Sequence, residues 1–329
     1  MKVLITGANG FVGLNVVKAL VAAGHEVTAY VRASSNVAFL EPFGVTLVRG
    51  ELHDRQALRA AMAGHEGVIH TAGNTSSNAR DWPLLEAVNI EGTRQVAEAA
   101  LECGIARLVF TSTTSTIGAS DNPGVEATEE TSLTGFRAKN PYAKSKLQAE
   151  ELLYRACDRG LSVVILNPAE VLGAYDYSMQ WGRMVLAVNY NQLPFMPPGG
   201  ASFCGAGDVG QAHVNALTKG RSGERYIIAG ANTRYTGLIE TIEAVVQRKV
   251  DLPQINYSRF YLKTLLQEKL PWLVRGEPVL DAYRLRVFSG TYYFSSAKAE
   301  RELGYQPTSL NQMVSDCASW YRDNGFIAS

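Results

Sequence analysis

The sequence predicts an α/β fold in which a doubly wound parallel sheet carries a smaller, mixed α/β lobe toward the C-terminus. Three observations lead to this prediction. Short apolar runs alternate with segments of helical periodicity over the first two-thirds of the chain. A glycine follows each of four helical segments, and a glycine-rich turn joins the first apolar run to the first helical segment.

Six short runs rich in β-branched residues are predicted to be strands. They are almost continuously apolar, as strands are when a parallel sheet is covered on both faces. The runs cover residues 3–6, 27–31, 45–48, 68–70, 107–111 and 162–166.

Four segments between these runs have a 3.6-residue apolar period and are predicted to be helices: residues 11–23, 54–62, 84–103 and 143–159. Gly24, Gly64, Gly104 and Gly160 follow them, at the position where a helix end favours a positive φ. Strand, helix, glycine and strand in repetition indicate a doubly wound sheet.

From about residue 175 onward, strand-like and helical segments no longer alternate regularly. We expect helices over residues 179–190, 208–219, 236–248 and 257–274, a strand over 225–229, and a loop over the proline- and glycine-rich residues 194–200. Residues 1–174 would then form a first domain, to which residues 201–230 return, and residues 175–329 would form an interleaved second lobe.

Composition excludes several classes of protein. The 31 Lys and Arg balance the 31 Asp and Glu, and 46% of residues are apolar, so neither a disordered chain nor a nucleic-acid or membrane-surface binder is expected. No stretch approaches 18 uninterrupted apolar residues. The four cysteines are scattered and no histidine spacing suits a metal, so we expect a cytoplasmic protein without a metal site.

The turn T-G-A-N-G-F-V-G at residues 6–13 is typical of a dinucleotide-binding site. Gly7 permits the tight turn, Gly10 lets the backbone approach a pyrophosphate, and Gly13 lets the helix pack closely on the strand. The helix N-terminus offers free N–H groups to the phosphates. The first domain is therefore predicted to bind a dinucleotide, through Gly7, Asn9, Gly10, Phe11, Val12 and Gly13.

The end of the second strand indicates which nicotinamide cofactor is bound. An NAD site places an acidic residue about 20 residues beyond the glycines, where it accepts from the ribose 2′-hydroxyl. Arg32 stands there instead, followed by Ser34 and Ser35. A guanidinium can pair bidentately with a 2′-phosphate, so NADP is the predicted cofactor and NAD is the alternative.

A Y-x-x-x-K pattern opens the helical segment 143–159. Its spacing puts Tyr142 and Lys146 on one helix face, one turn apart. Free tyrosine has a pKa near about 10, so it is a poor acid–base group at neutral pH. A nearby ammonium and a positive nicotinamide ring favour the phenolate, which predicts a lowered pKa for Tyr142 and a catalytic role for the pair.

The G-x-x-G-x-x-G spacing resembles that of the short-chain dehydrogenase/reductase superfamily, and in particular its extended branch, the NAD-dependent epimerase/dehydratase superfamily, with its Rossmann-type sheet. G-E-L-H-D at residues 50–54, V-I-H-T-A-G at 68–73, V-N-I-E-G-T at 88–93 and N-P-A-E-V-L-G at 167–173 resemble further motifs of that branch. The resemblance implies cofactor contacts from Glu51, Leu52, Thr71, Ala72, Gly73, Pro168 and Val171.

The run V-F-T-S-T-T-S-T-I-G at residues 109–118 resembles the motif that carries the family's catalytic serine. Counting from Phe110, that position falls on Thr113, whose hydroxyl would polarise the substrate carbonyl. Ser112 is the alternative if the strand ends one residue earlier. The resemblance also implies cofactor contacts from Thr111, Ser112, Tyr142 and Lys146.

Two enzyme classes share these motifs. One reduces a ketone or aldehyde with NADPH; the other epimerises or dehydrates a nucleotide sugar with a tightly bound NAD(P). Glu170 stands where the nucleotide-sugar enzymes have an asparagine beside the diphosphate. At about 4 Å and an effective dielectric near 20, each like-charge pair costs on the order of 4 kcal/mol. The family's diphosphate-binding arginine is also missing from residues 201–209.

The remaining resemblance is to dihydroflavonol-4-reductase-like carbonyl reductases, supported by E-P-V-L at residues 277–280. It predicts reduction of a small-molecule carbonyl substrate. Residues 74–82 and 179–181, with Phe195 and Met196, are expected near the substrate and suit an apolar ketone with one polar group. A non-catalytic NADP-binding sensor is the third reading. Members of the superfamily commonly form homodimers, which here would use residues 84–103 and 143–159.

Overall fold

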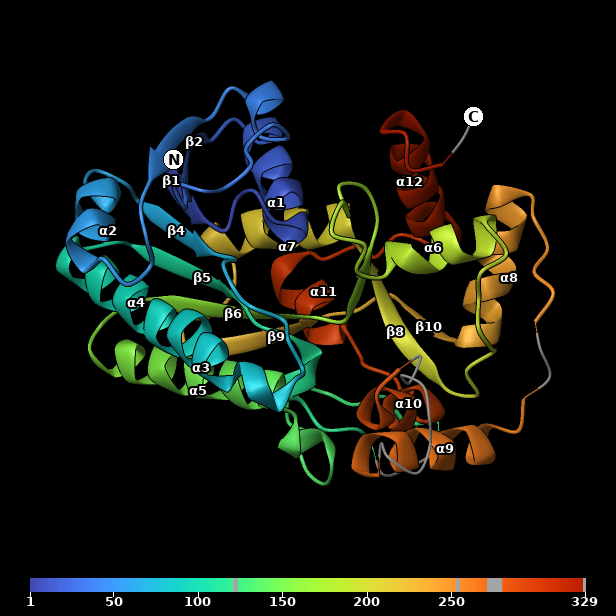
Figure 1. Ribbon diagram of the computed structural model, residues 1–329. Coiled ribbons are helices and arrows are strands. Elements are labelled where there is room, and N and C mark those ends of the chain that lie inside the picture. The colour runs from blue at the N-terminus through green and yellow to red at the C-terminus, as the bar shows by residue number, and fades with distance from the viewer. Residues whose placement is uncertain (121–123, 253–254, 271–279, 328–329) are drawn as a thin grey trace.

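Two sheets of unequal size organise the computed structural model of this chain, which describes residues 1–120, 124–252, 255–270 and 280–327 (Figure 1). The larger sheet has seven strands in the order β3-β2-β1-β4-β5-β6-β9. Each pair of neighbours in it is parallel. The predicted α/β fold class is confirmed.

The seven strands of the larger sheet lie within one or two residues of the predicted runs, including the run at 225–229. They are β1 Lys2–Thr6, β2 Glu26–Val31, β3 Thr46–Arg49, β4 Gly67–His70, β5 Arg107–Thr111, β6 Val163–Pro168 and β9 Glu224–Ile228. The smaller sheet was not predicted. It contains β7 Glu170–Leu172, β8 Gly200–Gly205, β10 Ala231–Arg234 and β11 Thr291–Tyr292.

Helices cover both faces of the larger sheet (Figure 1). One layer contains α2 Arg55–Met62, α3 Trp82–Leu85, α4 Gly92–Glu102 and α5 Pro141–Asp158, and the other contains α1 Phe11–Ala22 and α7 Ala206–Thr218. Alternate residues of β1 therefore face different helices. Val3 and Ile5 pack in the core that includes Leu14 of α1, whereas Leu4 packs in the core that includes Leu153 of α5.

The single helix predicted over residues 84–103 is divided. A π-helical segment, Glu86–Glu91, separates α3 from α4. Within it, buried Asn89 accepts a hydrogen bond from the amide of Asn74 at 2.7 Å and donates to Ser145 Oγ at 2.9 Å. Widened helical turns of this kind are frequent at functional sites, and this one connects the loop after β4 to α5.

The second lobe carries α6 Gly182–Asn189, α8 Tyr235–Val246, α9 Tyr257–Lys269, α10 Ala282–Ser289 and α12 Leu310–Asp323, while α11 Ala297–Leu303 lies beside α7. The predicted helix start at residue 179 is wrong. Met179 has a φ of 52°, and the buried Asp176 carboxylate accepts the amides of Gln180 and Gly182 at 2.8 and 2.9 Å, so the helix begins after this cap. Residues 271–274 and 277–279 of the predictions lie outside the described residues.

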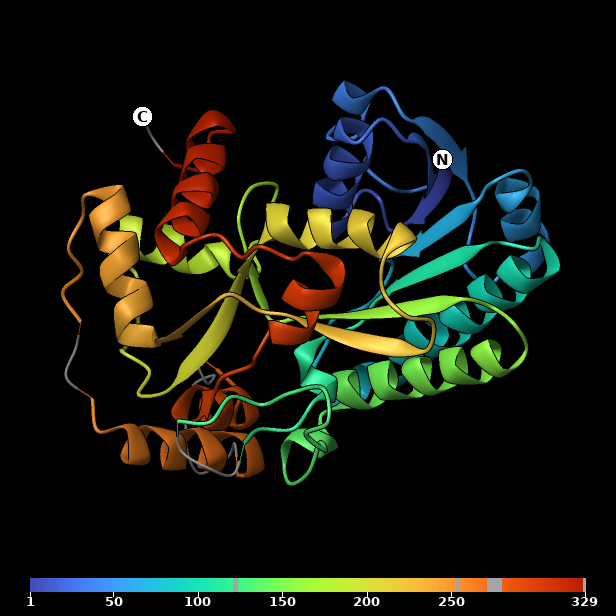
Figure 2. The same ribbon diagram turned by 180° about the vertical axis from the view of Figure 1, so that it is seen from behind.

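The segment 201–230 is shared between the two sheets (Figure 2). Its first strand, β8, pairs with β7, β10 and β11 of the smaller sheet. Its helix α7 then packs on α1, and β9 extends the larger sheet beside β6. The division into a dinucleotide-binding domain and a substrate-binding lobe accordingly remains a proposal.

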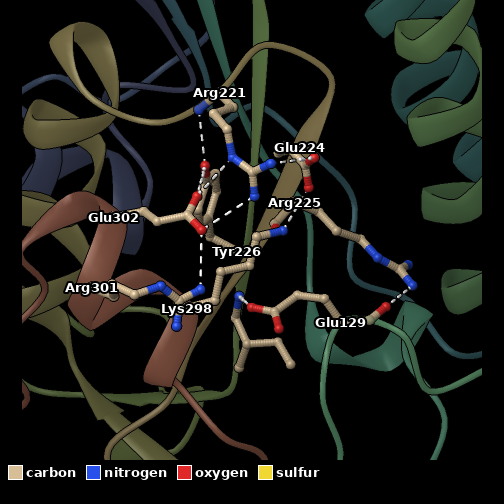
Figure 3. Close-up of polar contacts among 9 residues, drawn as sticks. Glu129, Arg221, Glu224, Arg225, Tyr226, Lys298, Arg301 and Glu302 are labelled. Atoms are coloured by element: carbon tan, nitrogen blue, oxygen red, sulfur yellow. Dashed lines mark hydrogen bonds and ion pairs between the residues drawn. The ribbon is translucent and has the colours of Figure 1, made fainter.

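Ion pairs and hydrogen bonds tie β9 to α11 on the rim of the larger sheet (Figure 3). Arg221 pairs with Glu302 at 3.1 Å, and the Tyr226 hydroxyl donates to the same carboxylate at 2.8 Å. Lys298 of α11 bonds Glu224 at 2.7 Å. These contacts hold the returning strand against the helix that follows the smaller sheet.

None of the helices in the described parts of the chain is both long and apolar enough to cross a membrane.

The contact between the glycine turn and α1 predicts a stability effect. A Cβ on Gly13 would lie 2.1 Å from the Gly7 carbonyl oxygen and 2.9 Å from Ala8 Cα, both parts of the backbone. We expect Gly13→Ala to lower the free energy of unfolding by about 2–4 kcal/mol through overpacking, measured by urea denaturation. Gly207→Ala is the matched control, because nothing lies within 4 Å of its Cβ, and it should cost no stability. Equal loss in both variants would contradict the packing argument.

Candidate active site

The residues singled out from the sequence lie mainly at the carboxyl ends of the central strands. The glycine turn follows β1 and Thr71 follows β4, which are neighbours in the sheet although the chain visits two other strands between them. Parallel sheets bind ligands at such a point, where the strand order reverses. Thr113 follows β5, and Pro168 ends β6 beside it.

The glycine turn has the geometry of a phosphate cradle. Gly7 has a φ of +71°, and a Cβ there would lie 2.5 Å from the Ala72 amide nitrogen. Gly10 is the N-cap of α1 and has no side chain to accept from the helix, whose first amide bonded within the helix is that of Leu14. The amides of the first helical turn are therefore left for an anion. These residues fit a dinucleotide pyrophosphate.

An aromatic cluster from distant segments lies against the outside of this turn. The Tyr177 hydroxyl donates to the Asn9 carbonyl at 2.7 Å, and its ring stacks on Phe39 at 5.6 Å. Phe39 in turn contacts Trp320 of α12 at 5.5 Å. The sequence analysis missed these residues because they come from three separate parts of the chain.

Arg32 is exposed at the end of β2, with its side chain free to meet a ligand in solvent. A second guanidinium lies close by, since Arg49 Nη1 donates to the carbonyls of Arg32 and Ala33 at 3.2 and 2.8 Å. Glu51 is also exposed, and its carbonyl accepts from the Tyr30 hydroxyl at 3.1 Å. Positive charge thus gathers at the end of β2 and β3.

Hydrogen bonds hold the loop after β4 to the end of β1 and, through Asn89, to α5. Thr71 donates through Oγ1 to the Thr6 carbonyl at 2.8 Å. Asn89 donates to the Asn74 carbonyl at 2.9 Å, and its partner Ser145 donates to the Tyr142 carbonyl at 2.8 Å. Ala72 and Gly73 are therefore positioned beside the first turn of α5.

Thr113, Tyr142 and Lys146 lie together at the N-terminal end of α5. The Tyr142 hydroxyl and the Thr113 side chain are hydrogen-bonded to each other. The Lys146 ammonium donates to the Thr111 carbonyl at 2.7 Å and lies 3.9 Å from the centre of the Phe110 ring. Asn140 caps the helix by accepting from the Ala143 amide at 3.0 Å, which fixes where Tyr142 stands.

Ser112 points away from Tyr142. It is buried, and its hydroxyl donates to Glu150 Oε1. Successive side chains of an extended segment point to opposite sides, so Thr113 faces Tyr142 while Ser112 faces the interior. Of the two hydroxyls considered from the sequence, Thr113 is the one in contact with the tyrosine.

Burial governs the titration of Tyr142. It raises the pKa of the phenol to about 12, with the hydrogen bond from Thr113 acting in the opposite direction and the Glu170 carboxylate adding to the rise. In the chain without a cofactor, Tyr142 therefore does not have the lowered pKa that was predicted from its spacing to Lys146. Desolvation of the phenolate is the largest cause of the shift. The Lys146 ammonium donates to the Thr111 carbonyl.

Lys146 shows the opposite shift. Burial lowers the pKa of its amine to about 7, and the Glu150 carboxylate one turn along α5 partly offsets the effect. Burial lowers the pKa of the His70 imidazole in β4 to about 3, and the Lys146 ammonium adds to that effect. The side chain of Lys146 is therefore divided between its charged and neutral forms near neutral pH.

Glu150 is the central buried carboxylate of the site. One oxygen, Oε1, accepts from Thr116 Oγ1 and Asn167 Nδ2, both at 2.9 Å, in addition to Ser112. The other oxygen lies 3.6 Å from Arg225 of β9. The sequence analysis did not single out Glu150, although its position four residues after Lys146 on one helix face was visible.

Glu170 and Arg137 lie on the side of Tyr142 that faces the second lobe. Glu170 in β7 accepts a hydrogen bond from the Trp181 indole, and burial raises the pKa of its carboxyl. Arg137 was not singled out from the sequence, and no local pattern marks it. Val171 pairs with Cys204 of β8, so the N-P-A-E-V-L-G segment runs from the larger sheet into the smaller one.

A hollow of about 540 Å³ reaches Glu150 and Arg225 but none of Thr113, Tyr142 and Lys146. It is lined by residues of α5, β9 and the 129–130 segment, and it includes neither Tyr142 nor the glycine turn. We assign no ligand to it.

The chain resembles known proteins along nearly its full length. The sequence model of the NAD dependent epimerase/dehydratase family matches residues 3–229. Sterol demethylase protein B of Methylococcus capsulatus is 31% identical, with 99% of this chain and 100% of that protein aligned. The 2-alkyl-3-oxoalkanoate reductase of Stenotrophomonas maltophilia is 31% identical over 93% of this chain and 95% of that protein.

Comparison of structures agrees with comparison of sequences. The crystal structure of gox2253 superposes with a TM-score of 0.87 at 30% identity, and 99% of each chain is covered. The relatives of this chain also include dihydroflavonol 4-reductase-like proteins. The chain belongs to the NAD-dependent epimerase/dehydratase family, the extended branch of the short-chain dehydrogenases/reductases, and is an NAD(P)-dependent oxidoreductase of that type.

Proposed function

We propose that the protein reduces a ketone or aldehyde to an alcohol with NADPH. The observation that carries the proposal is the contact of Tyr142 with Thr113, one helical turn from Lys146 and beside the strand ends that flank the glycine turn. The family gives the NAD(P) dependence. The relative named 2-alkyl-3-oxoalkanoate reductase acts, by its name, on a ketone.

Four parts of the chain would hold the cofactor. The free amides after Gly10 would bind the pyrophosphate, Arg32 the 2′-phosphate, and Lys146 the nicotinamide ribose. The segment from Pro168 to Val171 would lie beside the nicotinamide. When bound, NADPH supplies the hydride that the carbonyl carbon receives.

Tyr142 provides the proton. Its raised pKa keeps the phenol protonated at neutral pH, so Oη can donate to the carbonyl oxygen as that oxygen gains negative charge. Thr113 donates its one hydroxyl proton to the phenol in the chain without substrate, and with substrate bound that proton would turn to the carbonyl oxygen as a second donor. Proton loss leaves a buried phenolate, and the adjacent Lys146, in its ammonium form, lowers the cost of that charge.

The surroundings of Tyr142 favour a carbonyl substrate over a nucleotide sugar. Glu170 lies within electrostatic reach of Tyr142, in the position where the diphosphate would bring further negative charges. A carboxylate there repels a diphosphate. The complete Thr113, Tyr142 and Lys146 set also supports turnover over a sensor that only binds NADP.

The proposal extends to assembly and location. The family resemblance supports a homodimer through α4 and α5, and the balanced charge supports a cytoplasmic enzyme with a small-molecule substrate. Light scattering of the purified protein tests the dimer.

Replacing the proton donor tests the mechanism. Tyr142→Phe should lower kcat for NADPH-dependent ketone reduction at least ~10²-fold, in line with typical general-acid contributions, because the hydroxyl that donates is gone. Tyr154→Phe, on the same helix but lining a hollow that does not include Thr113, Tyr142 or Lys146, should retain activity. The steady-state rate of NADPH oxidation, followed by absorbance, measures both. Retained turnover in Tyr142→Phe would remove the residue from its role.

Cofactor choice tests Arg32. Arg32→Asp should shift the ratio of kcat/KM for NADPH to that for NADH toward NADH by about 10²-fold or more, because a charge-assisted pair to the 2′-phosphate is replaced by repulsion. Arg248→Asp, which makes the same charge change at the end of α8, should leave the ratio unchanged. An unaltered ratio in both variants would contradict the 2′-phosphate argument.

The buried lysine predicts a pH-dependent stability. In the folded chain the pKa of Lys146 is lowered from 10.5 to about 7, so the unfolded chain binds more protons between these values and folding gains stability as pH rises through that window. Lys146→Met lacks this titration. The free energy of unfolding of the wild type, minus that of the variant, should therefore increase from pH 7 to pH 10, measured by urea denaturation. A constant or falling difference would show that the amine is not desolvated.

A further inference from the structure

Arg137 carries a buried donor with nothing to bond. Its Nη1 atom is inaccessible to solvent and has no hydrogen-bond partner among the described residues. Its Nη2 atom makes one long contact, 3.4 Å to the Thr114 carbonyl. Buried polar groups are almost always paired, and an unpaired charged donor is the more costly kind. The guanidinium therefore has the capacity for a further acceptor.

Aromatic rings hold this guanidinium in place. Its central carbon lies 4.6 Å from the centre of the Tyr292 ring and 5.9 Å from that of Phe294. Stacking on ring faces accounts for how a cation tolerates this burial, and it leaves the N–H groups of Nη1, at the edge of the guanidinium, without an acceptor. Arginine remains charged in this environment because its pKa, although lowered by burial, starts far above neutral.

Arg137 is adjacent to the proposed catalytic residues. Arg137 contacts the carbonyl of Thr114, the residue that follows Thr113. Arg137 also opens the short helical turn that ends just before Asn140, the N-cap residue of the helix that carries Tyr142. Glu170 interacts electrostatically with both Arg137 and Tyr142. The unpaired donor and the phenol therefore share a neighbour on the side of the second lobe.

Glu170 does not satisfy Arg137. Within the described chain, the ion pairs at 4 Å or less do not include these two residues, and the carboxylate of Glu170 is bonded to the Trp181 indole instead. Trp181 also stacks on Tyr235 at 6.0 Å, so the indole that bonds Glu170 is itself held among the aromatic rings of the second lobe. The described residues therefore supply no acceptor for Nη1 of Arg137.

We propose that Arg137 binds a carboxylate on the ketone substrate, so that the enzyme reduces oxo acids. The assignment rests on the proposed carbonyl reduction and names its substrate class. The planar fork of a guanidinium matches a carboxylate in two parallel hydrogen bonds. The aromatic rings around it suit the apolar remainder of such a molecule, and the single negative charge meets less repulsion from Glu170 than a diphosphate does.

A comparison of one oxo acid with its ester tests the assignment. We take a medium-chain 3-oxoalkanoate and its methyl ester, which differ in the charge that Arg137 would bind. The wild type should reduce the acid with a kcat/KM about 10²-fold above that of the ester, as expected for charge-assisted hydrogen bonds. Arg137→Met should abolish this ratio, and Arg137→Lys, which keeps the charge without the fork, should retain part of it.

Arg286→Met is the matched control. Arg286 is exposed and also stacks on an aromatic ring, Phe136, at 4.2 Å. Its loss should leave the acid-to-ester ratio unchanged. The assignment would be overturned if the wild type reduced the acid and the ester with equal kcat/KM, or if Arg137→Met left the acid-to-ester ratio unchanged. Either result would leave carbonyl reduction intact.

A binding measurement separates this assignment from the proposed function. The corresponding 3-hydroxyalkanoate cannot react when NADPH is present, so isothermal titration reports its affinity without turnover. We expect the affinity to fall about 10²-fold in Arg137→Met and to be retained in Arg286→Met. If no ketone is reduced but this difference is observed, the carboxylate site stands and the reduction fails. If both variants bind as the wild type does, the carboxylate site fails.

Discussion

The buried carboxylate of Glu150 is the interaction on which the arrangement of the site depends. A buried charge is costly unless it is fully hydrogen-bonded. Ser112 and Thr116 after β5, Asn167 in β6 and Arg225 in β9 all meet it. The carboxyl ends of β5 and β6 and the start of β9 are thereby fixed to one turn of α5. Because Lys146 stands one turn before Glu150 on the same helix, the distance of the lysine from the end of β5 is fixed as well.

The direction of the neighbouring side chains follows from that anchor. With Ser112 held inward by Glu150, the next residue of an extended segment must face the other side. Thr113 therefore meets Tyr142, and the carbonyl of Thr111 meets Lys146. The same burial sets the electrostatics, since it disfavours charge on either group: the pKa of Tyr142 rises to about 12 and that of Lys146 falls to about 7. A tyrosine in this state is a proton donor, as reduction of a carbonyl requires.

The second lobe completes the site from the other side. β7 continues from β6 into the smaller sheet, and it carries Glu170 from the cofactor-binding strands to the aromatic rings of Trp181 and Tyr235. Arg137 lies in the segment before α5, stacks on Tyr292 of β11 and interacts electrostatically with Glu170. The groups that we propose to bind and to react thus lie beside both sheets.

The sequence by itself determined the larger sheet, most of its helices, the glycine turn and the place of Tyr142 one turn before Lys146 on the same helix, because each depends on local periodicity or on spacing within one element. Only the tertiary structure decided the rest. The π-helical break at residues 86–91 and the late start of α6 arise from Asn89 and Asp176 bonding to partners outside the local period. The short strands of the smaller sheet have too few residues to show a period. The roles of Glu150 and Arg137, and the raised pKa of Tyr142, come from burial among distant segments, and burial is a property of the folded chain alone.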